Sequence, residues 1–96
     1  RMAMTYIVAY DIAANGRRNR VAHTLQSWGY RIQESVFQLR LEAADLDVVR
    51  QKLESIIDSM DDVVHIYPVC TGCAARAEIL GTAVALDDVG LYRGLW

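Results

Sequence analysis

The sequence predicts an α+β domain in which an antiparallel sheet carries two helices on one face. Three observations support this: an apolar run at residues 4–10, a helical hydrophobic pattern at residues 43–60, and the chain order strand, helix, strand region, helix, strand. That order is the split βαβ pattern of a ferredoxin-like βαββαβ sandwich. At 96 residues and 10.8 kDa the chain is long enough for one core. We place the domain at residues 4–81, and interpret residues 1–3 as a cloning remnant.

The first strand and helix follow from residue type and spacing. Residues 4–10 are almost all apolar or aromatic, which is typical of a strand in the middle of a sheet. Asn15-Gly16 favours a turn, and Asn15 is expected to cap a helix that begins near Arg17. Gly29 is expected to end this helix in a left-handed conformation. The apolar residues of the helix recur at helical spacing: Val21, Leu25 and Trp28.

Residues 30–41 alternate between apolar and polar side chains, as in a strand. The phase of this alternation slips by one residue near Ser35-Val36-Phe37. Such a slip indicates a bulge or a tight turn. The segment is therefore either one bent strand or two strands joined by a short turn.

The second half of the domain reads as a helix and a strand. Residues 43–60 place one apolar stripe on a helix, formed by Leu46, Val49, Leu53, Ile56 and Met60. Residues 63–67 form the next strand, which Pro68 is expected to stop because it cannot donate a ladder hydrogen bond. Residues 78–81 are expected to add a short edge strand. Residues 82–96 form an apolar tail that we expect to pack on a second subunit or another partner.

Composition restricts the class of protein. The hydrophobic share of 53% is high, yet no apolar run approaches the length of about 20 residues that a membrane span needs. The excess indicates an oligomer interface. No signal-peptide pattern opens the sequence, so we expect a cytoplasmic protein without a membrane partner.

Charge is distributed unevenly around the net value of −2. Residues 1–40 carry six arginines and two acids, whereas residues 41–96 carry four basic residues and ten acids. The overall charge argues against a protein that binds nucleic acid through bulk positive charge. The split suits a molecule with one phosphate-facing side and one acidic side.

Asp11, at the end of the first strand, is the strongest candidate for a metal-binding or catalytic residue. A carboxylate there needs a metal, an arginine or backbone donors. One interpretation is a salt bridge to Arg17, Arg18 or Arg20. The other is a site for Mg²⁺, which prefers six oxygen ligands, so that Asp11 would meet its own copy across a two-fold axis.

The arginines at the start of the first helix favour phosphate binding. Arg17, Arg18 and Arg20 lie where the helix dipole disfavours cations but backbone N–H groups favour phosphate. Positive charge there does not stabilise the helix. We therefore favour a role of these arginines in phosphate binding over a role in solubility alone.

Cys70 and Cys73 form a lone C-x-x-C motif. A closed zinc site needs four ligands, and a thioredoxin-type site sits between a strand and a helix, whereas Pro68 and Gly72 indicate a turn. We therefore expect two reduced cysteines in a partly buried turn. A metal carrier that uses this pair is a weaker alternative. The two histidines lack a Ser or Cys partner for a nucleophilic triad.

Four motifs, in order, resemble the CRISPR-associated endoribonuclease family, the second and smaller of the two universal CRISPR adaptation proteins. They are Ala9-Tyr10-Asp11-Ile12, Asn15-Gly16-Arg17-Arg18, Gln33-Glu34-Ser35-Val36-Phe37 and Ile66-Tyr67-Pro68-Val69-Cys70. The similarity extends from Met4 to about Gly81. It implies a homodimer that joins the CRISPR integrase in spacer acquisition, and whose tail adds a strand to the other subunit's sheet.

The resemblance also implies a site. Asp11 is similar to the family's catalytic, metal-binding aspartate, with Mg²⁺ or Mn²⁺ as cofactor and single-stranded RNA or duplex DNA as substrate. The implied nucleic-acid-binding positions are Tyr10, Arg17, Arg18, Arg20, Arg31, Ser35 and Phe37. No general base is evident from the sequence. The alternative function is a non-catalytic dimeric scaffold that bridges integrase copies on duplex DNA, in which Asp11 is structural.

Overall fold

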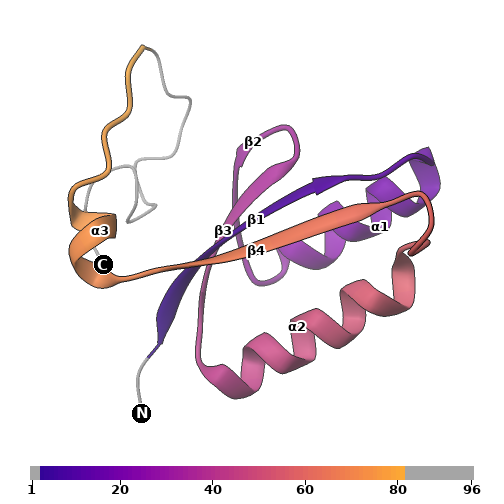
Figure 1. Cartoon of the computed structure of the whole chain (residues 1–96), viewed down its shortest axis with the longest axis horizontal. Helices are drawn as coiled ribbons and strands as arrows, with labels where there is room; N and C mark the ends of the chain where they lie inside the picture. Colours follow the sequence, from indigo (N-terminus) through magenta and orange to yellow (C-terminus); the bar gives the residue numbers. More distant parts are fainter. Residues whose placement is uncertain (1–2, 82–96) are drawn as a thin grey trace.

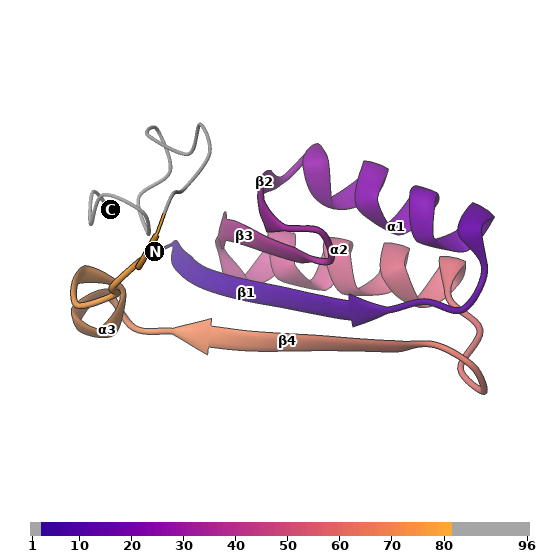
Figure 2. The same cartoon turned by 90° about the horizontal axis from the view of Figure 1, so that it is seen from above.

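The computed structural model describes residues 3–81 as two layers, a four-stranded antiparallel sheet and two long helices on one of its faces (Figures 1 and 2). The elements are β1 (Met4–Asp11), α1 (Asn15–Gln26), β2 (Gly29–Gln33), β3 (Val36–Leu41), α2 (Ala43–Ile56), β4 (Val63–Val69) and the short α3 (Thr71–Ala75). This order confirms the predicted ferredoxin-like α+β fold. Residues 82–96, and with them the predicted tail, lie outside the described residues.

The sheet has the strand order β2-β3-β1-β4, and every neighbouring pair is antiparallel. The apolar run of β1 therefore lies in the middle of the sheet, as predicted. β4 continues to Val69 and does not stop at Pro68. Because β4 is an edge strand within the described sheet, the missing N–H group of Pro68 can face away from β1.

Residues 30–41 form two strands, which decides between the two interpretations of the phase slip. Glu34 and Ser35 make the connecting turn, and the register shifts between Arg31 and Gln33. The backbone N–H of Tyr10 donates to the carbonyl of Ser35 at 3.1 Å. This bond holds the turn against the end of β1.

The core lies between the sheet and the helices. Tyr6, Val8 and Tyr10 of β1 point into it, together with Ile12, Val21, Ala22, Leu25, Phe37, Leu39, Leu41, Val49 and Leu53. Because side chains alternate along a strand, Ile7, Ala9 and Asp11 point to the other side of the sheet. We call this side, opposite α1 and α2, the open face.

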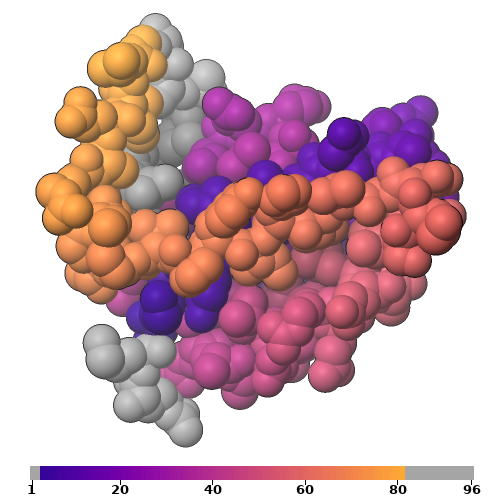
Figure 3. Space-filling model, in the orientation of Figure 1, coloured from indigo at the N-terminus to yellow at the C-terminus, as the bar shows by residue number. Residues whose placement is uncertain are grey.

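β4 contributes to the same open face. Its residues opposite Ile7, Ala9 and Asp11 are, respectively, Tyr67, His65 and Val63. Residues directly opposite each other in an antiparallel pair point to the same side of the sheet. In the space-filling view β4 crosses the visible surface, with parts of β1 beside it (Figure 3).

The ends of α1 differ from the prediction. The helix begins at Asn15, and its N-cap is Ala14, without a side-chain hydrogen bond. It ends at Gln26 with Ser27 as a right-handed C-cap, so Gly29 does not cap it. Gly29 starts β2, where a Cβ atom would lie 2.1 Å from the carbonyl oxygen of Gln38. Glycine is required there by close backbone approach.

Three further expectations for the second half need correction. α2 ends at Ile56, and the side chain of Met60 is 88% exposed, although Val49 and Leu53 are buried as predicted. Residues 78–81 form no strand. Cys70 and Cys73 flank the start of α3, where a turn was expected. Among residues 3–81, no helix is long and apolar enough to cross a membrane.

Candidate nuclease site

Asp11 is the last residue of β1 and projects from the open face at one end of the sheet. Its side chain is exposed, and within residues 3–81 it makes no hydrogen bond and no ion pair. The start of β4 lies beside it, through the pairing with Val63, and the β2–β3 turn lies on its other side. Asp11 is therefore an uncompensated carboxylate at this end of the sheet.

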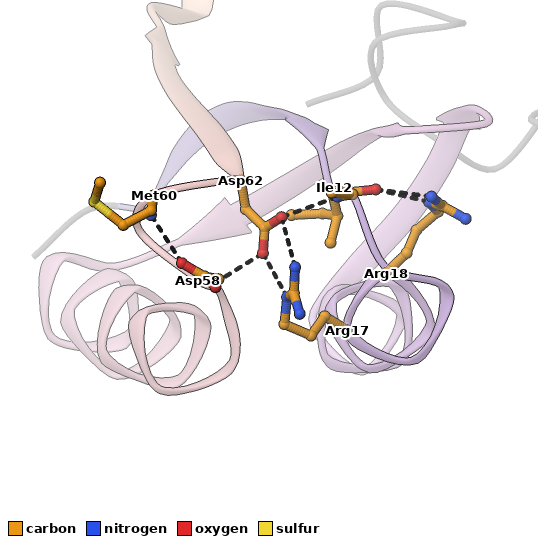
Figure 4. A network of polar contacts seen from close by, with 7 residues as sticks. Ile12, Arg17, Arg18, Asp58, Met60 and Asp62 are labelled. Carbon is orange, nitrogen blue, oxygen red and sulfur yellow. Dashed lines mark hydrogen bonds and ion pairs between the residues drawn. The ribbon is translucent and has the colours of Figure 1, made fainter.

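The predicted salt bridge between Asp11 and the arginine cluster is absent, because Arg17 pairs with Asp62 instead. Arg17 Nε donates to Asp62 Oδ2 at 2.7 Å, and Arg17 Nη2 donates to Asp62 Oδ1 at 3.2 Å (Figure 4). The backbone N–H groups of Ala13 and Asp58 donate to the same carboxylate, both at 2.8–2.9 Å. The carboxylate of Asp62 thus joins the loop after β1, the start of α1 and the loop before β4.

This network shifts the pKa values of Arg17 and Asp62. The hydrogen bond from Arg17 is the main cause that holds the pKa of Asp62 well below its usual range, supported by the backbone donors. The same hydrogen bond raises the pKa of Arg17. Asp58 and Asp61 add negative charge near the guanidinium. Arg17 is therefore largely neutralised, and the acidic loop beside it weakens the basic character expected at this end.

Arg18 turns to the opposite side of α1, as Figure 4 shows. Its guanidinium donates to the carbonyl of Ile12 at 2.8 and 3.2 Å and to the side-chain oxygen of Asn15. These bonds fix the turn between β1 and α1. They leave the positive charge of Arg18 without a carboxylate partner among residues 3–81.

Arg20 and Arg31 are the exposed cations of the predicted set. Arg20 lies on the first turns of α1, and Arg31 lies on β2, with its guanidinium carbon 5.1 Å from the ring centre of Phe37. Neither makes an ion pair within residues 3–81. Both can therefore offer free charge to a phosphate.

Tyr10 and Phe37, two of the predicted nucleic-acid-binding residues, pack in the core. Phe37 is fully buried, and Tyr10 is 6% exposed. Their rings stack with centres 6.3 Å apart, and the Tyr10 hydroxyl donates to the carbonyl of Glu34 at 3.4 Å. Tyr10 and Phe37 thus support the β2–β3 turn from the core side of the sheet. Ser35, in that turn, is half-buried beside the end of β1.

His65 was missed by sequence reasoning. Its strand pairs with β1, so its exposed side chain lies on the open face opposite Ala9 and diagonally across from Asp11. Such diagonal neighbours are about 7–8 Å apart. His65 Nδ1 and the Tyr67 hydroxyl are hydrogen-bonded at 2.7 Å. Only the strand pairing could have revealed this neighbour, because His65 is far from Asp11 in sequence.

Within residues 3–81, the donor set of a single chain is incomplete for a divalent metal. Asp11 supplies an accessible oxygen ligand of the type that Mg²⁺ prefers. However, no group of three or more His, Cys, Asp or Glu side chains suited to a metal occurs within residues 3–81. Asp11 fits a metal as one ligand, and further ligands must come from outside residues 3–81, from water or from substrate.

Comparisons with known proteins agree with this architecture. Residues 4–77 match the family model for the CRISPR associated protein Cas2. The chain is 39% identical over 79 residues to CRISPR-associated endoribonuclease Cas2 1 of Chloroflexus aurantiacus, which covers 81% of this chain and 85% of the relative. It is 40% identical over 76 residues to CRISPR-associated endonuclease Cas2 2 of Thermus thermophilus, which covers 79% and 80%.

A solved structure supports the same assignment. The crystal structure of Streptococcus pyogenes Cas2 at pH 6.5 matches with a TM-score of 0.74 and 29% identity, over 81% of this chain and 100% of that chain. The family match over residues 4–77 spans β1 with Asp11, α1, the β2–β3 hairpin and β4. Sequence and fold thus agree, and the chain belongs to the Cas2 family of CRISPR-associated proteins.

Proposed function

We propose that the chain acts as a homodimer with the CRISPR integrase in spacer acquisition, and that it hydrolyses phosphodiester bonds of RNA or DNA with Mg²⁺ or Mn²⁺. The observation that carries the proposal is the exposed, unpaired carboxylate of Asp11 at the end of β1. The relatives named endoribonuclease and endonuclease support the reaction class. An acid that does nothing for the fold is free to serve a metal.

Asp11 is the residue that would hold the metal. A bound divalent ion supplies Lewis-acid activation of the phosphate and of an attacking water. One carboxylate is a weak ligand set for an ion that needs six oxygens. A second copy of the chain, related by a two-fold axis, would bring its own Asp11.

The open face supports a homodimer. Tyr30 and Tyr67 are about half exposed, at 52% and 51%, and Val63 is 48% exposed. Between them, Gln38 is only 2% exposed. A second copy of the chain that covered the two tyrosines and Val63 would remove their apolar surface from water.

Arg20 and Arg31 are the residues we assign to phosphate binding. They carry free charge, whereas the charge of Arg17 is balanced by Asp62. Arg18 adds positive charge while it holds the β1–α1 turn. Contacts of this kind position a backbone without reading its sequence.

His65 is the residue we assign to proton transfer. In the tautomer that donates from Nδ1 to the Tyr67 hydroxyl, Nε2 is free to accept a proton from an attacking water. Tyr67 would orient the ring. His65 thus takes the role of general base for which the sequence offered no candidate.

The test is cleavage of labelled single-stranded RNA and duplex DNA with Mg²⁺ by the wild-type protein, Asp11→Asn and Asp47→Asn. Asp47 is an exposed acid on α2 that pairs with Arg50, so its variant controls for loss of one surface carboxylate. We expect cleavage by the wild type and the control and none by Asp11→Asn. Cleavage by Asp11→Asn at the wild-type rate would refute the nuclease assignment.

The scaffold function remains the second candidate, because residues 3–81 of one chain build no complete metal site. A scaffold dimer would bind the integrase and duplex DNA without any need for Asp11. Equal integrase binding by the wild type and Asp11→Asn, with no cleavage by either, would favour it. Gel filtration with light scattering on the wild type and Tyr30→Ser tests the dimer in both cases, since loss of a half-exposed ring of the open face should weaken it.

A further inference from the structure

The C-x-x-C motif lies between a strand and a helix. β4 ends at Val69, Cys70 is the N-cap residue in an extended conformation, and α3 follows directly. Both cysteine side chains are exposed and unbridged. The expected partly buried turn is therefore wrong, and with it the reason for setting aside a redox interpretation.

Each sulfur of the pair accepts a hydrogen bond. The backbone N–H of Cys73 donates to Cys70 Sγ at 3.3 Å, and Arg76 Nη2 donates to Cys73 Sγ at 3.6 Å. Donors aimed at sulfur stabilise a thiolate relative to a thiol. The side chain of Ala74 is 1% exposed, so α3 is packed against the domain and holds both cysteines in place.

The two thiols are chemically distinct. The hydrogen bond from the Cys73 side chain is the largest cause that lowers the pKa of Cys70, followed by the bond from the Cys73 backbone. The same side-chain bond raises the pKa of Cys73. Cys70 therefore loses its proton more readily than Cys73 and is the better nucleophile of the two near neutral pH.

We propose that Cys70 and Cys73 form a redox-active dithiol site, in which Cys70 attacks a small disulfide and Cys73 resolves the product. The Cys70 thiolate attacks one sulfur of the disulfide, the S–S bond of the reagent breaks, and one thiol is released after it takes up a proton. The Cys73 thiol then loses its proton and attacks Cys70 Sγ, and the second thiol leaves. The protein dithiol is oxidised to a disulfide, and the reagent is reduced to two thiols.

Oxidation would change how α3 is held. Cys70 Sγ caps the first turn of the helix, and Cys73 Sγ holds the side chain of Arg76 just beyond its last turn. A Cys70–Cys73 bond replaces the thiol and thiolate that accept these hydrogen bonds. Oxidation of the two cysteines would therefore affect α3, the segment that directly follows the edge strand β4.

The test uses reduced full-length protein, oxidised glutathione and intact-mass spectrometry. The chain has only two cysteines, so each product has a distinct mass. We expect the wild type to lose two hydrogens, and Cys73→Ser to accumulate one glutathione adduct that it cannot resolve. Cys70→Ser, whose hydroxyl can still cap α3, should form its adduct several-fold more slowly.

A second measurement needs no substitution. Under limiting iodoacetamide at neutral pH, peptide mapping of the wild type should show Cys70 alkylated at least about threefold faster than Cys73. Equal alkylation of the two cysteines would overturn the proposal. So would equal adduct formation by the two serine variants, or a wild type that carries two adducts and no internal disulfide.

Discussion

Arg17 and Asp62 lie 45 positions apart in the sequence and form a two-point ion pair that joins the start of α1 to the loop before β4. The side chain of Asp62 is fully buried, whereas that of Arg17 is 25% exposed. Four hydrogen bonds converge on this one carboxylate. The pair therefore fixes the end of the sheet at which Asp11 lies.

Asp62→Asn should destabilise the domain more than any substitution of an exposed acid. The amide keeps the shape but loses the charge that Arg17 and two backbone donors require. Urea unfolding followed by circular dichroism should give a clearly lower midpoint for Asp62→Asn than for Asp47→Asn, whose surface pair contributes about 0–1 kcal/mol. A double-mutant cycle with Arg17→Met should show coupling. Equal midpoints for the two asparagine variants would show that the network is not stabilising.

The Arg17–Asp62 pair also predicts how stability depends on pH. The pKa of Asp62 in the folded protein lies well below its ordinary value of 3.8. Its contribution is therefore complete above the ordinary value and is lost as the pH falls toward the folded pKa. The unfolding free energy of the wild type should drop below about pH 5, as protons bind the unfolded chain more readily. Asp62→Asn should show a shallower drop, and parallel curves would contradict the assignment.

Phe37→Ala should destabilise the domain by about 3–5 kcal/mol, because the side chain is fully buried between the sheet and the helices. Phe37→Leu should cost less and leave a folded protein. Fluorescence anisotropy with labelled duplex DNA should then show unchanged affinity for Phe37→Leu at temperatures where it is folded. A large loss of affinity in that folded variant would instead support the predicted role of Phe37 as a nucleic-acid contact.

Gly29→Ala should destabilise the β2–β3 hairpin by about 1–3 kcal/mol, because the new methyl group overlaps the carbonyl of Gln38. Gly16→Ala is the matched control, since its Cβ atom would meet nothing closer than 3.7 Å. Thermal unfolding should separate the two variants clearly. If Gly16→Ala lowered the melting temperature as much as Gly29→Ala, close approach would not be the reason for glycine at position 29.

His65→Gln should reduce Mg²⁺-dependent cleavage by about 10²-fold or more if the imidazole accepts a proton in the reaction. The low-pH limb of the rate profile should flatten in the same variant, which a purely structural role would not cause. His23→Gln changes an exposed histidine on α1 and should leave the rate unchanged. Equal rates for the two variants would remove His65 from the mechanism.

The local sequence pattern was sufficient to predict the elements whose buried residues repeat with the period of a strand or a helix. β1 and the apolar face of α2 could be predicted because Val8, Val49 and Leu53 repeat with the period of their element and are all buried. α3 could not, because a five-residue helix has too short a pattern, and Pro68 suggested that the strand before it had ended. The wrong interpretation of the cysteines followed from that error.

The candidate site was predictable at Asp11 but not around it. A charged residue at the end of an apolar strand is visible in the sequence, whereas the partner of Arg17 depends on how the loop before β4 folds against α1. The face to which Tyr10 and Phe37 point depends on strand register. His65 became a neighbour of Asp11 only through the β1–β4 pairing.

The different roles of Asp62 and Asp11 have a consequence for evolution. Asp62 stabilises this end of the sheet through its hydrogen bonds and ion pair, whereas Asp11 makes no hydrogen bond or ion pair within residues 3–81. Position 11 can therefore change without a compensating change elsewhere in the fold. Under the proposed function, a single substitution at position 11 would abolish cleavage while the fold is kept.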